Sequence, residues 1–254
     1  MKKSFIFILN EIALLSRFSW RFIKDGFKPR YEISEFFRQS YFVGYKSFML
    51  VGITAFIMGL VITIQSRPTL VEFGAEAWLP KMVSVSLVRE IAPVITALIC
   101  AGKIGSGMGA ELGSMKVTEQ IDAMEVSGTN PFKYLVVTRV FATILMIPIL
   151  AILADAISLY GGFLGCNIRG DISWVLYWNQ VFETLSYGDV LPAIVKTFFF
   201  GFAIGIVGCY KGYYSSKGTE GVGHSANSAV VLSSLLVFIL DLIAVQIIDL
   251  LNLT

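Results

Sequence analysis

Histidine and cysteine, which often bind metals or act in catalysis, are scarce in this 254-residue sequence. It contains one histidine and three cysteines, Cys100, Cys166 and Cys209, and no two cysteines stand in a C-x-x-C spacing. So small and dispersed a set supports neither a metal site nor a framework of disulfides. Each cysteine is expected to be a small buried apolar residue. No nucleophile–base pair falls in the apolar segments, so an enzyme is the least favoured class of protein.

Charged residues are also few, at 15% of the sequence against 56% hydrophobic residues. This balance, with a mean hydropathy of +0.73, is far from that of a soluble domain and predicts an integral membrane protein. A chain of this length has room for about five or six membrane spans of roughly 20 residues. We therefore expect one all-α bundle, a single domain over residues 1–254, and no nucleic-acid partner.

Five apolar segments are long enough to cross a bilayer. They are residues 47–66, 82–110, 140–168, 191–210 and 225–248. The first is expected to end at Arg67 and Pro68. Residues 4–24 carry apolar side chains at helical spacing beside several cations, which predicts an interfacial helix that lies on the membrane. Residues 1–46 would then form an interfacial and cytoplasmic segment, and residues 47–254 the transmembrane bundle.

The distribution of lysine and arginine predicts the orientation of the chain. Residues 1–46 carry nine, residues 103–139 carry four, and Lys211 and Lys217 add two more on the same side. The other side has only Arg67, Lys81 and Arg169. With five spans the N-terminus is therefore expected in the cytoplasm and the C-terminus on the extracytoplasmic side.

Small residues recur every four positions near the end of the second apolar segment. Ala101, Gly105, Gly109 and Gly113 would line one face of a helix with almost no side chains. Such a strip allows another helix to approach closely, which is a more common use than direct contact with a ligand. The phosphate-loop pattern G-x-x-x-x-G-K-[ST] is absent, so this chain is not expected to bind nucleotide itself.

A short amphipathic helix is predicted directly after this strip. Ile121 and Met124 share one face, whereas Glu119, Asp122 and Glu125 lie on another. Ser114 or Thr118 would cap its start, and Gly128 would end it. By the charge distribution this helix is cytoplasmic, and from the residues alone a solvated connector is the simpler interpretation.

The sequence from Val88 to Val140, VREIAPVITALICAGKIGSGMGAELGSMKVTEQIDAMEVSGTNPFKYLVVTRV, closely resembles the signature region of the MlaE-type (YrbE-like) permeases. These are the membrane subunits of lipid-transporting ABC systems that work with MCE proteins. The resemblance extends more weakly over nearly the whole chain. Thr138 departs from it, since the family often has proline there.

The resemblance implies a homodimer of permeases in the bacterial inner membrane, with a separate ATPase that binds ATP and Mg and an extracytoplasmic MCE partner. The acidic helix stands where the family has its coupling helix. Glu119, Asp122 and Glu125, with Ile121 and Met124 as apolar anchors, are therefore expected to dock the ATPase. The resemblance also matches Arg89 and Glu90 to a motif at a lipid cavity.

Several ionisable residues fall inside the apolar segments, where each costs roughly 2.5–3.5 kcal/mol on insertion scales unless it is paired or hydrated. Arg89 and Glu90 either neutralise one another or neighbouring partners, or Arg89 attracts a lipid phosphate. Asp155, Lys196 and Asp241 are expected to contain a structural Asp–Lys pair. Two alternatives remain open: an ion-coupled transporter built on these three residues, and a non-transporting scaffold of an envelope complex.

Overall fold

The computed structural model of the protein describes residues 2–28, 32–168, 170–216 and 218–251. Arg169 and Lys217, which entered the charge comparison, lie outside these ranges. The helices in chain order are α1 (Lys2–Gly26), α2 (Ile33–Val43), α3 (Tyr45–Glu72), η1 (Glu76–Trp78), α4 (Leu79–Ser86), η2 (Leu87–Ile91), α5 (Ala92–Cys100), η3 (Ala101–Gly105), α6 (Ser106–Val117), α7 (Gln120–Val126), η4 (Phe132–Val137), α8 (Thr138–Asn167), α9 (Trp174–Thr184), α10 (Tyr187–Tyr213) and α11 (Thr219–Leu250). The described residues contain no strand, so the all-α prediction is confirmed.

Five stretches are long and apolar enough to cross a membrane, as predicted. They are Ile33–Glu72, Glu76–Val117, Phe132–Asn167, Tyr187–Tyr213 and Thr219–Leu250. Every stretch exceeds the roughly 20 residues that a bilayer requires. The bundle therefore extends beyond the hydrocarbon layer.

The first span ends later than the sequence predicted, because Pro68 lies inside α3. A proline there removes the hydrogen bond that its own amide would donate to the carbonyl of Ile64 and crowds that carbonyl, but it need not end the helix. The helix continues to Glu72, and the amide of Phe73 donates to the carbonyl of Thr69 at 3.2 Å. Arg67 pairs with Glu76 of η1 at 2.5 Å and holds this corner together.

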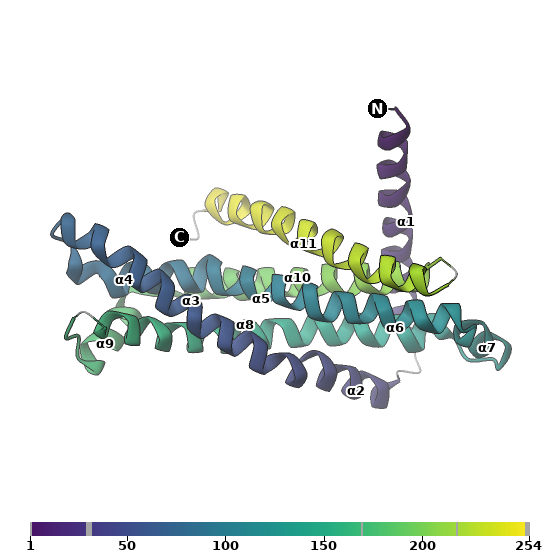
Figure 1. The fold of residues 1–254 in the computed structure, drawn as a ribbon, viewed down its shortest axis with the longest axis horizontal. Coiled ribbons are helices and arrows are strands. Elements are labelled where there is room, and N and C mark those ends of the chain that lie inside the picture. Colours follow the sequence, from purple (N-terminus) through teal and green to yellow (C-terminus); the bar gives the residue numbers. More distant parts are fainter. Residues whose placement is uncertain (1, 29–31, 169, 217, 252–254) are drawn as a thin grey trace.

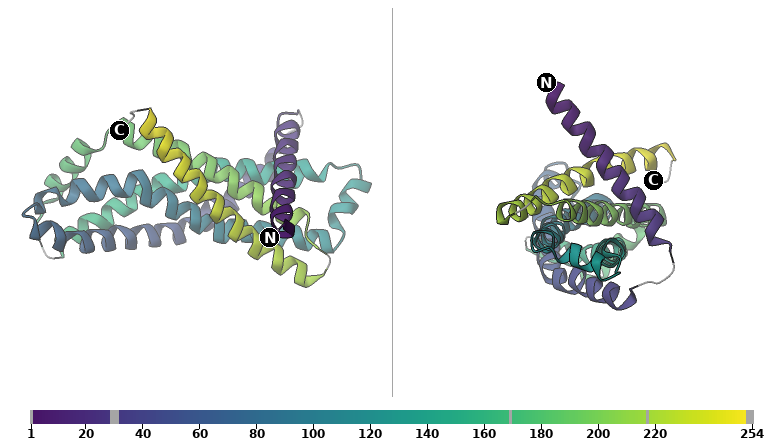
Figure 2. Two further views of the ribbon diagram at one scale, coloured as in Figure 1. Left: turned by 90° about the horizontal axis from the view of Figure 1, so that it is seen from above. Right: turned by 90° about the vertical axis from the view of Figure 1, so that its right-hand side faces the viewer.

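The helices lie side by side along one long axis (Figure 1). α8 packs against α3 and α10, and α10 packs against α11 and α6. Figure 1 shows α7 at one end of the bundle and α4 and α9 at the opposite end. α11 crosses the other helices obliquely (Figure 2) and has the least buried apolar window of the five spans.

α1 stands across the bundle instead of along it (Figures 1 and 2). Phe18 and Phe22 are its buried contacts, and the ring of Phe18 lies 5.0 Å from that of Phe132 and 5.5 Å from that of Tyr210, between centroids. Lys211 of α10 also pairs with Glu11 at 2.8 Å. These contacts fix α1 near the α7 end of the bundle, and its position at a membrane surface stays a prediction.

Glycines allow the central helices to approach closely. A Cβ on Gly201 would lie 2.6 Å from the carbonyl oxygen of Thr143 in α8. A Cβ on Gly212, farther along α10, would lie 2.9 Å from the carbonyl oxygen of Gly109 in α6. The glycines of α10 therefore serve two neighbours, α8 in the middle of the helix and α6 near its end.

Replacing Gly201 by alanine should force α10 and α8 apart. The new Cβ would meet the carbonyl oxygen of Thr143 and, at 2.9 Å, the Cα of Ile144. Both are backbone atoms, which cannot rotate away as a side chain can. We expect a loss of about 1–3 kcal/mol, the usual cost of overpacking, measured as a lower melting temperature of the protein in detergent.

The matched control is Gly223→Ala in α11, where a Cβ would meet no atom within 4 Å. Alanine is the better helix former, so this variant should be unchanged or more stable by up to ~1 kcal/mol. An equal loss in both variants would contradict the assignment of Gly201 to a close helix contact.

Candidate functional site

A lysine is buried inside the bundle with two carboxylates. The side chain of Lys196 in α10 is 3% exposed, and its Nζ lies 2.6 Å from Oε2 of Glu90 and 2.9 Å from Oδ1 of Asp241. Glu90 belongs to the π-helical segment η2 and Asp241 to α11. One cation therefore ties three spans together. The expected Asp–Lys pair is confirmed between Asp241 and Lys196.

Arg89 has a different partner from Glu90, although the two are adjacent in the sequence. Nε and Nη2 of Arg89 donate to Oδ1 of Asp189, which lies in the first turn of α10. The other carboxylate oxygen of Asp189 accepts from the backbone amide of Ser186 at 2.8 Å and from its hydroxyl at 2.9 Å. Asp189 therefore caps α10 and holds Arg89 with the same carboxylate.

Arg89 and Glu90 do not pair with each other. Each of them pairs with a residue on a neighbouring helix. Successive residues of a helix point in different directions, so they rarely face one another. Asp189 escaped the sequence analysis. Its signal was present as Ser186 followed by Asp189 ahead of an apolar run, which is a capping-box pattern.

A cavity of about 180 Å³ opens beside these charges. Its walls come from η2, the start of α10 and the end of α11, and include Arg89, Glu90, Asp189, Pro192, Val245 and Asp249. The volume is below the roughly 300–1,000 Å³ of pockets that enclose whole drug-sized ligands. The cavity is large enough for the polar head group of a larger ligand, but not for a whole ligand of that size. Among the described residues Nη1 of Arg89 has no partner, so donors remain for a ligand.

Asp155 does not join the ion pairs of Lys196. It lies in the middle of α8, and its Oδ1 is buried without a hydrogen-bond partner among the described residues. Glu90 occupies the place beside Lys196 that the sequence analysis left open for Asp155. Of the three residues considered for ion coupling, only Lys196 and Asp241 form an ion pair with each other in this conformation.

α7 is joined to its neighbours by two sharp turns. Glu119, immediately before it, has a left-handed backbone with φ of 58°, which costs a non-glycine residue about 1–2 kcal/mol. After α7 the amides of Gly128 and Thr129 donate to the carbonyls of Glu125 and Met124, both at 3.0 Å. This is a Schellman motif, and Gly128 ends the helix as predicted.

The predicted side-chain cap of α7 is wrong. No side chain caps the start of α7, and the hydroxyl of Thr118 donates instead to the carbonyl of Ser114 at 2.8 Å. Thr118 is the C-terminal cap residue of α6. The chain changes direction at the next residue, the left-handed Glu119.

The two faces of α7 separate as the sequence pattern indicated. Glu119, Asp122 and Glu125 are exposed, and Asp122 pairs with Lys116 at 2.7 Å. Ile121 is 1% exposed and packs into the core together with the partly buried Met124, so both side chains hold α7 to its own bundle. The apolar residue that α7 does present is Val126, which is 90% exposed and which the sequence analysis did not single out.

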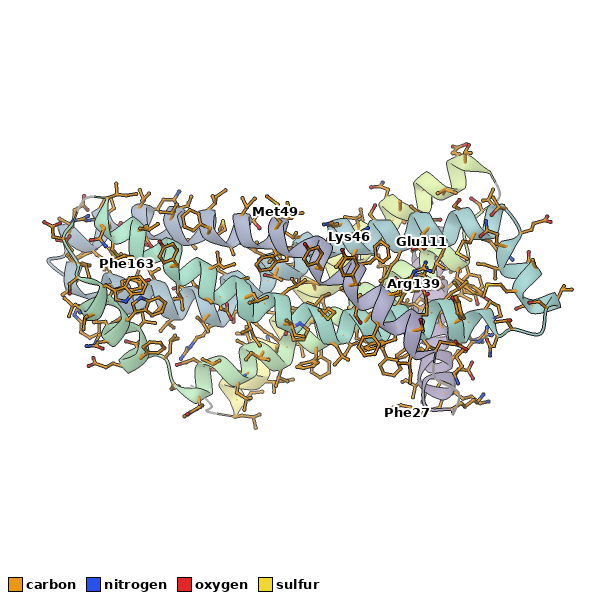
Figure 3. All side chains as sticks on the ribbon, turned by 90° about the horizontal axis from the view of Figure 1, so that it is seen from below. Phe27, Lys46, Met49, Glu111, Arg139 and Phe163 are labelled. Atoms are coloured by element: carbon orange, nitrogen blue, oxygen red, sulfur yellow. The ribbon has the colours of Figure 1, made fainter. Side chains whose placement is uncertain are left out.

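An ion pair between a buried arginine and a half-exposed glutamate connects the two spans on either side of α7. The side chain of Arg139 in α8 is 1% exposed, and its Nη2 lies 2.9 Å from Oε1 of Glu111 in α6. Nη1 donates to the carbonyl of Leu135 at 2.9 Å, whereas Nε has no partner among the described residues. Figure 3 shows Glu111 and Arg139 directed toward one another between their helices. This ion pair therefore holds together α6 and α8, the two helices between which α7 lies in the chain.

The strip of small residues on η3 and α6 faces α10 and α11. Ala101 is completely buried, a Cβ on Gly105 would contact Ser233, and one on Gly109 would lie 3.1 Å from the carbonyl oxygen of Ser225. Gly113 lies near Ser215. These residues contact other helices of the same chain and line neither of the cavities that contain charged residues near them.

Comparison with known proteins adds a family and several relatives. A family model described as "Permease MlaE" matches residues 36–247. A probable ABC transporter permease protein of Rickettsia prowazekii is 40% identical over 230 residues, which cover 91% of this chain and 89% of the relative. The intermembrane phospholipid transport system permease protein MlaE of Haemophilus influenzae is 33% identical over 208 residues, 81% of this chain and 79% of the relative.

Removing the carboxylate of Glu111 should destabilise the bundle, because the charge of Arg139 would stay buried with one acceptor fewer. For Glu111→Gln we expect a loss of about 1–3 kcal/mol, measured by thermal unfolding in detergent. Glu220→Gln, a change of an exposed acid at the same end of the bundle, should alter stability by no more than ~0.5 kcal/mol.

A double variant separates the ion pair from other effects of the substitution. Arg139→Met removes the buried charge, so Glu111→Gln should cost less in that background than in the wild type. Equal costs in the two backgrounds would show that the pair is not coupled.

Proposed function

We propose, from the premise that this chain belongs to the MlaE family of ABC transporter permeases, that it carries phospholipid between the membrane and an extracytoplasmic MCE partner. A separate cytoplasmic ATPase would bind ATP and Mg and supply the work. The observation that carries this proposal is the cavity beside Arg89 at one end of the bundle, with α7 and its exposed acids at the other. The relative from Haemophilus influenzae is named for phospholipid transport.

The cavity beside Arg89 has the chemistry of a lipid head-group site. Arginine has a planar fork of donors that matches the oxygens of a phosphate. Asp189 holds this fork in place while leaving Nη1 available. Val245 and Pro192 supply apolar walls next to the charge, as an amphipathic ligand requires.

The coupling route follows one helical stretch. Residues Glu76–Val117 run without interruption from the end that we assign to the extracytoplasmic side, past Arg89, to the turn into α7. Two π-helical segments, η2 and η3, lie within it. Such segments often mark functional positions in helices. A push on α7, which is clamped by Glu111 and Arg139, would move this whole stretch and so the wall of the cavity.

The exposed acids Glu119, Asp122 and Glu125 and the apolar tip Val126 are the surface that we assign to the ATPase. Ile121 and Met124 act from within, because they fix α7 to the bundle that it must move. A loose loop at this place would absorb the motion that nucleotide binding generates.

Further partners are assigned on composition and exposure. The exposed apolar face of α11 suits a second copy of the chain, as expected for a homodimer. Trp174 and Phe182 of α9 are 51% and 71% exposed at the end away from α7, where an MCE protein would dock. We propose the bacterial inner membrane as its location, with the N-terminus in the cytoplasm, in keeping with the distribution of lysine and arginine.

The alternative of ion-coupled transport has less support. Lys196 is already neutralised by Glu90 and Asp241, and Asp155 makes no ion pair with it. The relatives that are named as ABC transporter permeases favour an ATP-driven mechanism instead. A scaffold that transports nothing would be unaffected by changes at Arg89, which the experiments below examine.

Charge reversal on α7 tests the ATPase assignment. Glu119→Lys combined with Glu125→Lys should lower the lipid-stimulated ATPase activity of the reconstituted complex by about tenfold or more, because like charges at a docking surface repel. The control is Glu72→Lys, which reverses the charge of an exposed acid at the opposite end of the bundle and outside α9. Undiminished turnover in the α7 variant would refute the assignment.

Substitution of Arg89 tests the lipid site. Arg89→Gln should reduce the phospholipid that co-purifies with the complex, and slow ATP-driven lipid transfer, by about fivefold or more, since it removes a charge-assisted contact to phosphate. Arg67→Gln serves as the control, because Arg67 is also paired with a carboxylate but lies outside the cavity. If both variants retain lipid and transfer equally, Arg89 does not contact the cargo.

A further inference from the structure

A second charged cavity lies at the other end of the bundle, where the chain turns from α2 into α3. Its volume is about 290 Å³, and it lies between this corner and the segments η3 and α6. Arg38, Lys46, Lys103 and Glu111 contribute the charged groups of its wall. Figure 3 shows Lys46 on this corner, close to Glu111. None of these residues was assigned to a site above, apart from Glu111.

The charges of this cavity do not cancel. Glu111 is engaged by the buried guanidinium of Arg139 at 2.9 Å. Lys103 donates to the backbone carbonyl of Lys46, and the ammonium of Lys46 lies 3.9 Å from the ring centroid of Phe42. Among the described residues no carboxylate forms an ion pair with either lysine. The cavity thus offers two cations without a carboxylate partner, next to the exposed Arg38, which pairs with Glu35 at 3.5 Å.

A buried hydroxyl in the same cavity has no hydrogen-bond partner among the described residues. Ser47 is completely buried and lines the wall, and its Oγ makes no hydrogen bond among the described residues. An unsatisfied polar group in such a place costs roughly 1–3 kcal/mol. A ligand oxygen that accepts from Ser47 would remove this cost. The observation is independent of the lysines and also indicates a ligand with hydrogen-bond acceptors.

The rest of the wall is apolar and can accommodate hydrocarbon. Val43, Ile104 and Met108 are buried side chains of the cavity, and Phe42 is exposed beside them. Cations at the rim with apolar side chains behind them fit a lipid better than a soluble metabolite. Basic pockets between transmembrane helices on the cytoplasmic side are a recurrent way to bind anionic head groups.

The depth of the cavity places it at a membrane surface. Lys46 and Arg67 both lie on α3, 21 positions apart, which is about 32 Å along a helix axis. This is close to the roughly 30 Å of a bilayer hydrocarbon core. Lys103 contacts Lys46 and so lies at the same level. The two lysines mark one head-group layer, opposite the layer that Arg67 marks.

We propose that the cavity bounded by Arg38, Lys46, Ser47 and Lys103 binds the phosphate head group of an anionic phospholipid from the cytoplasmic leaflet. This assignment uses the orientation given under the proposed function, and it describes a second lipid site, distinct from the cavity at Arg89. The lysines neutralise the phosphate, Ser47 donates to one of its oxygens, and an acyl chain lies against Ile104 and Met108.

Native mass spectrometry of the delipidated protein provides the test. Dioleoyl-phosphatidylglycerol and dioleoyl-phosphatidylcholine are titrated separately, since they share the phosphate and the acyl chains but differ in net charge. Beyond the lipid of either kind that the Arg89 cavity holds, we expect the wild type to retain one additional phosphatidylglycerol per chain in preference to phosphatidylcholine. Lys46→Gln combined with Lys103→Gln should weaken this binding by about tenfold, in keeping with the contribution of lysines near an anionic surface.

Two variants guard against effects on folding and on overall charge. Ser47→Ala removes a hydroxyl that has no hydrogen-bond partner among the described residues, so the melting temperature of the delipidated protein should be unchanged or higher, while phosphatidylglycerol binding should fall by about threefold. Arg17→Gln combined with Lys24→Gln makes the same change of charge on the exposed face of α1 and should leave binding intact.

The outcomes separate this site from the proposed function. Arg89→Gln should leave the phosphatidylglycerol adduct in place. If Arg89→Gln removes that adduct and the lysine variant does not, the second site does not exist, whereas lipid transport through the Arg89 cavity still stands. Equal retention of both lipids by the wild type, or full displacement by millimolar glycerol 3-phosphate, would also overturn the proposal of an anionic lipid site.

Discussion

The arrangement of this bundle depends on the pairing of ionisable side chains that lie inside the membrane. Lys196 is almost completely buried, so its charge requires acceptors, and Glu90 and Asp241 provide them from two other helices. Because hydrocarbon solvates no charge, separating these helices would expose all three groups at once. Asp189 does the same for Arg89 and at the same time caps its own helix. Charge pairing thereby fixes the helices that surround the cavity beside Arg89.

Such short ion pairs require helices that lie close together, and the glycines make this possible. Gly201 and Gly205 bring α10 against α8, and Gly208 and Gly212 bring it against α6. In the membrane no hydrophobic effect drives helices together, so close backbone contact contributes much of the association. The small residues therefore bring the helices close enough for the buried charges to form ion pairs.

Polar groups gather at two levels of the bundle, separated by an apolar layer. One level contains Arg89 and Lys196 near the end away from α7, and the other contains Lys46, Lys103 and the Glu111–Arg139 pair. The stretch Glu76–Val117 passes through both and leads directly to the turn into α7. A displacement of α7 therefore reaches both cavities through one helix, and this is the route by which we propose that an ATPase drives lipid movement.

The sequence by itself determined the class of fold, the five spans and the two faces of α7, because these follow from local periodicity, from the length of apolar runs and from the scarcity of charge. It indicated that Lys196 would pair with an aspartate, since an isolated charge in hydrocarbon is too costly. Only the tertiary structure decided which groups meet. Glu90 joins Lys196 while Asp155 does not, Arg89 binds Asp189, and Ile121 turns inward. Such pairings depend on the rotation and offset of helices far apart in the chain, and no local pattern encodes these.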